Sequence, residues 1–140
     1  MRSLLITGGA GFIGANFAHY WAATHPDDRL VVLDALTYAG NRANLGGLES
    51  NANFRFVHGD IGDQGLVEEL MTGNAVDTLV HFAAESHVDN SISGPSAFIE
   101  TNIVGTFNLV QASYATWMNG PGQFKDEFRH ARFLHVSTDE

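Results

Sequence analysis

The stretch Gly8-Gly9-Ala10-Gly11-Phe12-Ile13-Gly14 decides the expected fold of this chain. It matches G-x-G-x-x-G from Gly9, and it stands between an apolar run, 4–7, and a segment with helical spacing, 12–24. A strand that passes through such a turn into a helix is typical of dinucleotide-binding sheets. Glycine permits the tight turn, and its missing side chain lets a pyrophosphate approach the helix N-terminus. A tight turn without a ligand is the alternative interpretation.

Acidic residues follow the next two apolar runs. Asp34 stands 34 − 14 = 20 residues after the last glycine of the loop. In dinucleotide-binding sheets a carboxylate at this distance accepts hydrogen bonds from the adenosine ribose and repels a 2′-phosphate, which favours NAD over NADP. The alternative is a strand-end aspartate that caps a turn. Asp60 follows the run 54–57 and is placed to face the adenine, although on spacing alone it can equally start a helix.

Apolar runs and amphipathic segments alternate along the whole chain. This alternation predicts an α/β fold with a doubly wound parallel sheet, the Rossmann fold, in a single domain over 1–140. Right-handed crossovers give the strand order 3-2-1-4-5. The segment 35–53 is polar and predicts a long loop with at most one helical turn. Strands are expected over 4–7, 30–34, 54–57, 78–83 and 133–136, and helices over 12–24, 65–71 (capped by Asp63) and 95–118, the last broken by 119–122.

Composition excludes several classes of protein. The 140 residues include 16 acidic and 7 basic ones, which gives a formal net charge of −9, together with 44% hydrophobic residues and no cysteine. The hydrophobic content argues against disorder, and the acidic balance argues against a nucleic-acid partner. Without cysteine there is no disulfide framework and no thiolate metal site. No run reaches membrane-spanning length or resembles a signal peptide, so we expect a soluble, cytoplasmic protein.

The seven histidines do not suggest a metal site. His19 and His25 are six residues apart, and so are His81 and His87, which is not a helical or zinc-ligand spacing. His81 and His135 fall in predicted strands and are interpreted as packed core residues. Trp21 and Trp117 are interpreted as core or interface residues.

The residues 7–14 resemble the opening of the extended short-chain dehydrogenase/reductase superfamily. Three further segments, 34–41, 81–89 and 137–140, narrow the resemblance to the dTDP-glucose 4,6-dehydratase family. The resemblance covers essentially all 140 residues, but only the N-terminal part of such an enzyme, well under half of it. We therefore expect a Rossmann fold that is cut short after its fifth strand, without the nucleotide-sugar-binding domain.

The chemistry of this family assigns roles to the end of the chain. Tightly held NAD oxidises C4 of the glucose, water leaves across C5–C6, and the hydride returns to C6. The resemblance implies that Asp139 is the acid and Glu140 the base of the elimination, that Thr138 hydrogen-bonds the C4 hydroxyl, and that Ser86 reaches toward the substrate. On composition alone, Asp139 and Glu140 would be a solvated chain end.

The resemblance also implies a set of residues that bind NAD. Backbone N–H groups of the glycine loop face the pyrophosphate, the end of the second strand faces the ribose, and the end of the third borders the adenine. Small residues after the fourth strand allow close approach of the cofactor, although ordinary core packing explains them equally well. The implied residues are Gly8, Gly11, Phe12, Ile13 and Gly14 in the loop, Asp34, Leu36 and Thr37 at the ribose, Asp60 and Ile61 at the adenine, and Phe82, Ala83, Ala84 and Thr101 along the cleft.

One element of the family is missing from the sequence. The family uses a Tyr-x-x-x-Lys pair to take the C4 hydroxyl proton, but no tyrosine here precedes a lysine by four, and the single lysine, Lys125, has Pro121 at that position. We therefore expect that these residues alone do not turn over dTDP-glucose. A 4-epimerase of the same superfamily and a stand-alone NAD-binding module are the alternatives, and an epimerase has no need of the pair Asp139–Glu140. The helix 95–118 resembles a dimer helix of the family, so we expect the full-length enzyme to be a homodimer.

Overall fold

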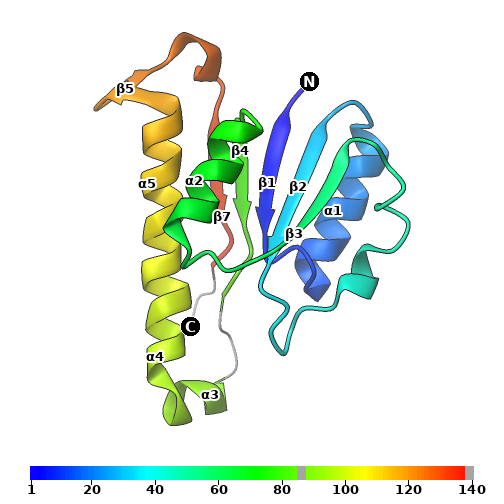
Figure 1. Ribbon diagram of the computed structural model, residues 1–140, viewed down its shortest axis with the longest axis vertical. Helices are drawn as coiled ribbons and strands as arrows, with labels where there is room; N and C mark the ends of the chain where they lie inside the picture. Colours follow the sequence, from blue (N-terminus) through cyan, green and yellow to red (C-terminus); the bar gives the residue numbers. More distant parts are fainter. Residues whose placement is uncertain (85–87, 138–140) are drawn as a thin grey trace.

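The computed structural model describes residues 1–84 and 88–137, and its centre is a five-stranded parallel sheet (Figure 1). The order of the strands is β3-β2-β1-β4-β7, which confirms the predicted order because β7 is the predicted fifth strand. The labels β5 and β6 belong to a small separate hairpin. The sheet strands are β3 (Phe54–His58), β2 (Arg29–Asp34), β1 (Ser3–Thr7), β4 (Thr78–His81) and β7 (Arg132–His135).

The central strand β1 is buried along its whole length because helices cover both faces of the sheet. On one face, Leu4 and Ile6 pack with residues of α1 (Phe12–Thr24). On the other face, Leu5 packs with residues of α2 (Gln64–Gly73) and α5 (Thr106–Trp117). Figure 1 shows α1 on one side of the sheet and α2 beside α5 on the other. This double cover confirms the doubly wound α/β class.

The predicted helix 95–118 is a continuous rod with three parts (Figure 1). It begins as α4 (Pro95–Phe98), continues as a π-helical segment, η2 (Ile99–Gly105), and ends as α5. A short helix that the sequence did not predict, α3 (Val88–Ser93), precedes it. No helix in the described parts of the chain combines the length and the apolar character needed to cross a membrane.

The connections agree with the sequence, and one of them contains an additional hairpin. The single predicted turn in the loop 35–53 is η1 (Arg42–Leu45), a 3-10 helix. The predicted break at 119–122 is confirmed, because α5 ends at Trp117, and the chain there forms an antiparallel hairpin that the sequence did not predict, β5 (Met118–Gly120) and β6 (Gln123–Phe124), followed by η3 (Asp126–Phe128). Gly122, with φ 71°, supplies the left-handed residue that this tight reversal requires.

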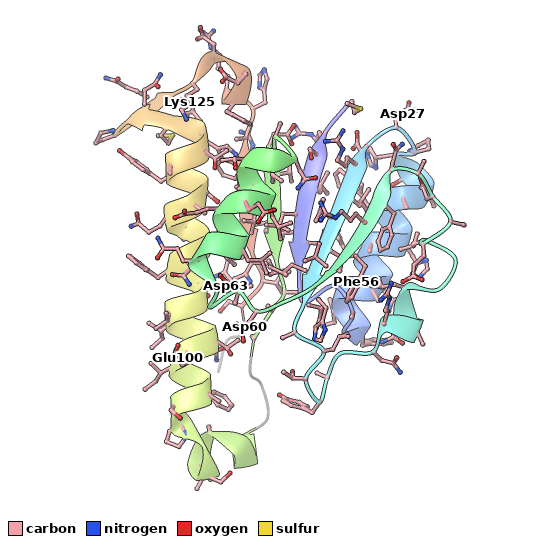
Figure 2. All side chains as sticks on the ribbon, in the orientation of Figure 1. Asp27, Phe56, Asp60, Asp63, Glu100 and Lys125 are labelled. Atoms are coloured by element: carbon pink, nitrogen blue, oxygen red, sulfur yellow. The ribbon has the colours of Figure 1, made fainter. Side chains whose placement is uncertain are left out.

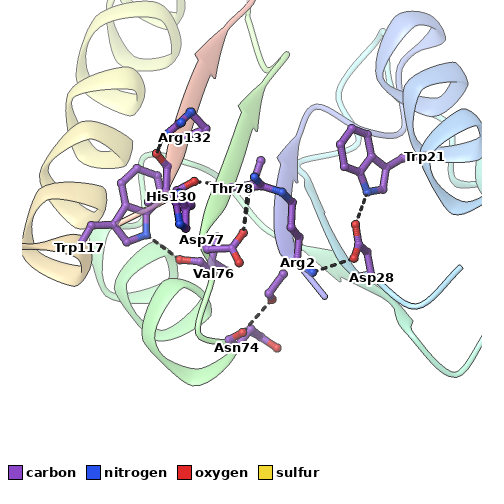
Figure 3. Close-up of polar contacts among 12 residues, drawn as sticks. Arg2, Trp21, Asp28, Asn74, Val76, Asp77, Thr78, Trp117, His130 and Arg132 are labelled. Carbon is purple, nitrogen blue, oxygen red and sulfur yellow. Dashed lines mark hydrogen bonds and ion pairs between the residues drawn. The ribbon is translucent and has the colours of Figure 1, made fainter. Parts of the chain in front are cut away.

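Side-chain hydrogen bonds tie the helices to the amino ends of the strands (Figure 3). Asp28 accepts from the N–H of Arg2 at 2.7 Å and from the indole N–H of Trp21 at 2.9 Å. The indole N–H of Trp117 donates to the carbonyl of Val76 at 2.6 Å. Trp117 is buried, and Trp21 is partly buried against the core beside α1, as the sequence predicts. These contacts stabilise the end of the sheet opposite the glycine loop.

A strained residue, Ala75, follows the end of helix α2, and its replacement should stabilise the chain. Ala75 has φ 47°, and the N–H of Val76 donates to the carbonyl of Met71 at 3.0 Å around it. Glycine adopts this left-handed conformation without strain, so we expect Ala75→Gly to raise the free energy of unfolding by about 0.5–1 kcal/mol in urea titrations. Ala43→Gly, at an exposed position in η1, is the control and should lower the free energy of unfolding. A loss of stability in both variants would contradict the expectation.

Candidate functional site

A cavity of about 620 Å³ lies at the carboxyl ends of the strands, where doubly wound sheets bind their ligands. All of the predicted cofactor-binding residues line it except Leu36. The predicted substrate and catalytic residues Ser86, Thr138, Asp139 and Glu140 lie outside the described residues. The lining consists of Gly8, Gly11, Phe12, Ile13, Gly14, Leu33, Asp34, Ala35, Thr37, Ala39, Gly40, Gly59, Asp60, Ile61, Phe82, Ala83, Ala84, Ala97, Thr101, Val136 and Ser137.

The glycine loop forms one wall of the cavity, and its backbone packs too closely for side chains. Gly8 has φ 68°, and a Cβ atom there would lie 2.6 Å from the backbone nitrogen of Ala83. A Cβ atom on Gly14 would overlap the carbonyl oxygen of Gly8. At Gly11, by contrast, an added Cβ would meet no other protein atom closer than 3.4 Å, although Gly11 also lines the cavity. The first and last of these glycines are thus required by packing, and the middle one leaves space open.

The start of α1 presents free backbone donors to this space. Its N-cap, Gly11, makes no side-chain cap, and the first turn contains no acidic residue. The first intrahelical donor is the N–H of Ala15, which bonds to the carbonyl of Gly11 at 2.9 Å. The N–H groups of Phe12 and Ile13 therefore have no acceptor within the helix, and the helix dipole adds partial positive charge. The donor set suits a phosphate without any lysine or arginine.

Asp34 stands on the cavity wall in a fixed orientation. Its Oδ2 accepts from the N–H of Ala10 at 2.8 Å, and its Oδ1 accepts from the N–H of Leu36 at 2.8 Å. Gly40 closes over the carboxylate, because a Cβ atom there would lie 2.7 Å from Oδ1. Each carboxylate oxygen keeps a lone pair for a further donor. The turn-capping alternative therefore describes part of what Asp34 does, while its position in the cavity leaves it available to a ligand.

Leu36 does not line the cavity. Its φ of 54° turns the backbone N–H toward Asp34, and its side chain packs against the core beside α1. Leu36 thus contributes to the site through the orientation of Asp34.

The opposite wall follows the ends of β3 and β4. Asp60 lies near the carboxyl ends of the strands, whereas Lys125 and Asp27 lie beyond their amino ends (Figure 2). Its Oδ1 accepts from the N–H of Gly62 at 2.7 Å, whereas α2 is capped by Asp63, which accepts from the N–H of Leu66 at 3.1 Å. Asp60 is therefore not the helix cap.

The predicted strand 78–83 ends two residues earlier than expected. β4 stops at His81, because Phe82, Ala83 and Ala84 leave the sheet to line the cavity. Thr101 reaches the same cavity from the π-helical segment.

A model of the family described as GDP-mannose 4,6 dehydratase matches residues 5–140 of the chain. The chain belongs to this family. A dTDP-glucose 4,6-dehydratase of Xanthomonas campestris pv. campestris (strain B100) is 54% identical over 140 residues, which are 100% of this chain and 38% of the relative. The chain therefore spans about two fifths of the length of this relative. The resemblance to dTDP-glucose 4,6-dehydratases is confirmed.

Two solved structures of such enzymes share the fold of this family member. DesIV, a dTDP-glucose 4,6-dehydratase from Streptomyces venezuelae with NAD and TYD bound, is 53% identical, with a TM-score of 0.75 over 82% of this chain and 36% of that chain. The dTDP-glucose 4,6-dehydratase from Bacillus anthracis str. Ames in complex with NAD is 34% identical, with a TM-score of 0.79 over 99% of this chain and 38% of that chain.

Two histidines of this dehydratase-family chain meet beneath the cavity. The His81 ring is buried between Thr7 and Thr106, as predicted for a core residue. Burial lowers the pKa of His81 from 6.5 to about 4, and the charge of His135 acts in the same direction. The rings of His81 and His135 stack with their centroids 4.8 Å apart. The prediction of a core position is wrong for His135, which is exposed because β7 is an edge strand that pairs with β4.

Sequence reasoning missed several lining residues of this family member. Gly40 closes over Asp34 from a loop whose path the sequence does not define, and Gly59 contacts the side chain of Leu66 so closely that a Cβ atom would overlap it. The dipeptide Gly59-Asp60 after a strand was the available signal for the second. Within the described ranges, 1–84 and 88–137, no group of three or more His, Asp or Glu side chains is placed to hold a metal ion.

Proposed function

We propose that this chain is the NAD-binding portion of a nucleotide-sugar dehydratase that converts dTDP-glucose to dTDP-4-keto-6-deoxyglucose. The observation that carries the proposal is one cavity that joins an uncapped helix N-terminus to a fixed carboxylate, Asp34. A dinucleotide has both complementary groups, an anionic pyrophosphate and a ribose diol. The relatives named as dTDP-glucose 4,6-dehydratases, and the NAD in their solved structures, support the choice of cofactor and substrate.

The lining residues divide the binding of NAD among them. The N–H groups of Phe12 and Ile13 hold the pyrophosphate, and Asp34 accepts from the adenosine ribose beside Thr37. Bound NAD supplies the hydride acceptor of the C4 oxidation and the hydride donor to C6. The remaining lining residues exclude water around the cofactor: Asp60 and Ile61 at the adenine, and Phe82, Ala83, Ala84 and Thr101 along the cleft.

The elimination requires an acid and a base, and we assign them to the last residues of the chain. Asp139 gives a proton to the leaving C6 hydroxyl, Glu140 takes the C5 proton, and Thr138 hydrogen-bonds the C4 hydroxyl. Ser86 contacts the substrate. Two neighbouring carboxyl groups divide such roles when their environments differ. These assignments rest on the family resemblance of the segments 81–89 and 137–140.

Turnover requires groups that the 140 residues do not supply. The chain has no Tyr-x-x-x-Lys pair, since its single lysine, Lys125, follows Pro121 by four. We infer that residues 1–140 form the NAD-binding domain, that the sugar-binding part lies elsewhere in the whole enzyme, and that the isolated chain binds NAD without turnover.

The surface and charge of the chain support a proposal for the partners of the whole enzyme. The rod from α4 to α5 exposes a stripe of apolar side chains, which supports a homodimer through this helix. The net charge of −9 supports a small-molecule substrate over a nucleic acid, and the absence of cysteine is consistent with a cytoplasmic location. The stripe consists of Ile99, Ile103, Phe107, Val110 and Tyr114.

The proposal is tested by comparing the two nicotinamide dinucleotides. By isothermal titration calorimetry we expect the chain to bind NAD about tenfold or more tightly than NADP, because Asp34 repels the 2′-phosphate. Asp34→Asn removes the negative charge. It should weaken NAD binding and reduce the difference in affinity between NAD and NADP. Asp63→Asn is the matched control, since asparagine also caps helices and Asp63 does not line the cavity. Equal binding of NAD and NADP by the unmodified chain would refute the proposal.

A further inference from the structure

Three buried or partly buried side chains form a hydrogen-bonded chain beneath the cavity. The Nδ1 atom of His81 lies 2.7 Å from the hydroxyl of Thr7, and its Nε2 atom lies 2.8 Å from the hydroxyl of Thr106. Thr7 is the last residue of β1, His81 is the last residue of β4, and Thr106 is the first residue of α5. One imidazole therefore joins two neighbouring strands to the helix that covers them.

Two of these residues, Thr7 and His81, are next to a segment that lines the cavity. Thr7 precedes Gly8, and His81 precedes Phe82. The two strand ends are also in direct contact, because the N–H of Phe82 donates to the carbonyl of Thr7 at 2.9 Å and the N–H of Ala83 donates to the hydroxyl of Thr7 at 3.4 Å. The glycine loop and the segment after β4 are thus joined through Thr7, which also bonds to the His81 ring.

The chain of hydrogen bonds is complete when His81 is neutral. A neutral imidazole has one donor and one acceptor, and a threonine hydroxyl has both. The hydroxyls of Thr7 and Thr106 can each donate to or accept from a ring nitrogen, so either neutral tautomer completes the chain. Within the described residues, the ring contacts Thr7 from β1, Thr106 from α5 and His135 from β7, and none of these three is a carboxylate.

We infer that His81 is a positioning residue of the dinucleotide site. By bonding to Thr7 and Thr106, it sets the spacing between the glycine loop, the segment 82–84 and the helix that carries Thr101. This inference rests on the proposed function of the cavity. It differs from the simpler reading of His81 as a packed core residue, because it requires that cofactor affinity depend on the two hydrogen bonds.

The test removes one hydroxyl and leaves the volume of the core almost unchanged. Thr106→Val breaks the bond to Nε2, and Thr106→Ser keeps it. At a temperature at which circular dichroism shows all variants folded, we expect Thr106→Val to weaken NAD binding about tenfold, equivalent to about 1.4 kcal/mol, and Thr106→Ser to stay within about twofold of the unmodified chain.

Two further variants separate positioning from loss of stability. Ser113→Ala removes another buried hydroxyl of α5, one whose oxygen has no hydrogen-bond partner. Trp117→Phe removes the bond from the indole to Val76 at the far end of α5 and should destabilise the fold. Both should leave the Kd for NAD unchanged. The inference is overturned if Thr106→Val binds NAD as the unmodified chain does, or if Trp117→Phe weakens binding equally.

A measurement without cofactor distinguishes failure of this inference from failure of the proposed function. In ligand-free nuclear magnetic resonance spectra, the ring nitrogens of His81 should report a single neutral tautomer. The amide signals of Gly8 and Ala83 should shift in Thr106→Val but not in Ser113→Ala. Unshifted amide signals overturn the role of His81, whether or not NAD binds. Absence of NAD binding to the unmodified chain, with the amide shifts present, overturns only the proposed function.

Discussion

Replacing Gly14 by alanine is expected to weaken NAD binding by about a hundredfold or more. The added Cβ atom would overlap the carbonyl oxygen of Gly8 and lie 2.8 Å from the Cα atom of Gly9, and both are backbone atoms. The loop has no room to withdraw, because Gly8 itself packs against the backbone of Phe82 and Ala83. The start of α1 must therefore shift, and with it the N–H groups that we assign to the pyrophosphate. Calorimetric titration with NAD measures the effect.

A second glycine provides the control for this substitution. Gly73, the last residue of α2, has no atom within 4 Å of an added Cβ. Gly73→Ala should leave NAD binding unchanged and should stabilise the chain slightly, because alanine is the better helix former. Without a clash, Gly14→Ala would also raise the free energy of unfolding, because alanine favours the helix. A lowered free energy of unfolding in Gly14→Ala therefore indicates the steric clash. NAD binding by Gly14→Ala at the affinity of the unmodified chain would contradict the assignment.

Acidification from pH 7 to pH 4 is expected to remove about 3 kcal/mol of stability through His81 alone. The pKa of His81 falls from 6.5 in the unfolded chain to about 4 in the fold, chiefly because the ring is buried. Between these values the unfolded state binds the additional proton, so the free energy of unfolding falls as the pH falls. Above pH 6.5 both states are neutral at this site and the stabilisation is fully present. Urea unfolding at pH 4, 5, 6 and 7 gives the slope.

Substitution of an exposed neighbour, His135, separates the contribution of His81 to the pH dependence of stability from that of the carboxylates. The charge of His135 also lowers the pKa of His81, so His135→Gln should raise that pKa and flatten the loss of stability between pH 6.5 and 4. The substitution lies on the edge strand β7 and should leave the core intact, since His135 is exposed. The His81 resonance should not titrate above about pH 5 in the unmodified chain. Titration near 6.5 would contradict the burial argument.

The parts of the fold that local chemistry determines were predictable. The glycine loop, the limits of α1 and the cap of α2 at Asp63 depend on neighbouring residues, and the strand order follows from the handedness of the crossovers. The end of β4 was not predictable in the same way. Phe82 and Ala83 were predicted as strand residues, but they leave the sheet and line the cavity. No local pattern distinguishes a strand residue from one that leaves the sheet to line a pocket.

The contacts of the candidate site show the same limit. The side chain of Asp34 was identified from its distance to the glycines, but its partners, the N–H groups of Ala10 and Leu36, depend on the path of a loop. His81 and His135 have the same spacing pattern of strand residues, and only the neighbours of β4 and β7 decide that one is buried and the other exposed. Such differences arise from tertiary position, which a single sequence records only indirectly.

The π-helical segment Ile99–Gly105 changes the direction in which the side chains of the long rod point around the helix axis. Each residue of an α-helix advances the side-chain direction by about 100°. A wider π-helical turn therefore rotates the side chains that precede it relative to those that follow it. Thr101 thereby reaches the cavity while Ile99 and Ile103 stay exposed, and α5 keeps Leu109 and Ala112 in the core. One continuous helical rod therefore contributes Thr101 to the ligand pocket at its amino-terminal end and apolar side chains to the hydrophobic core at its carboxyl-terminal end.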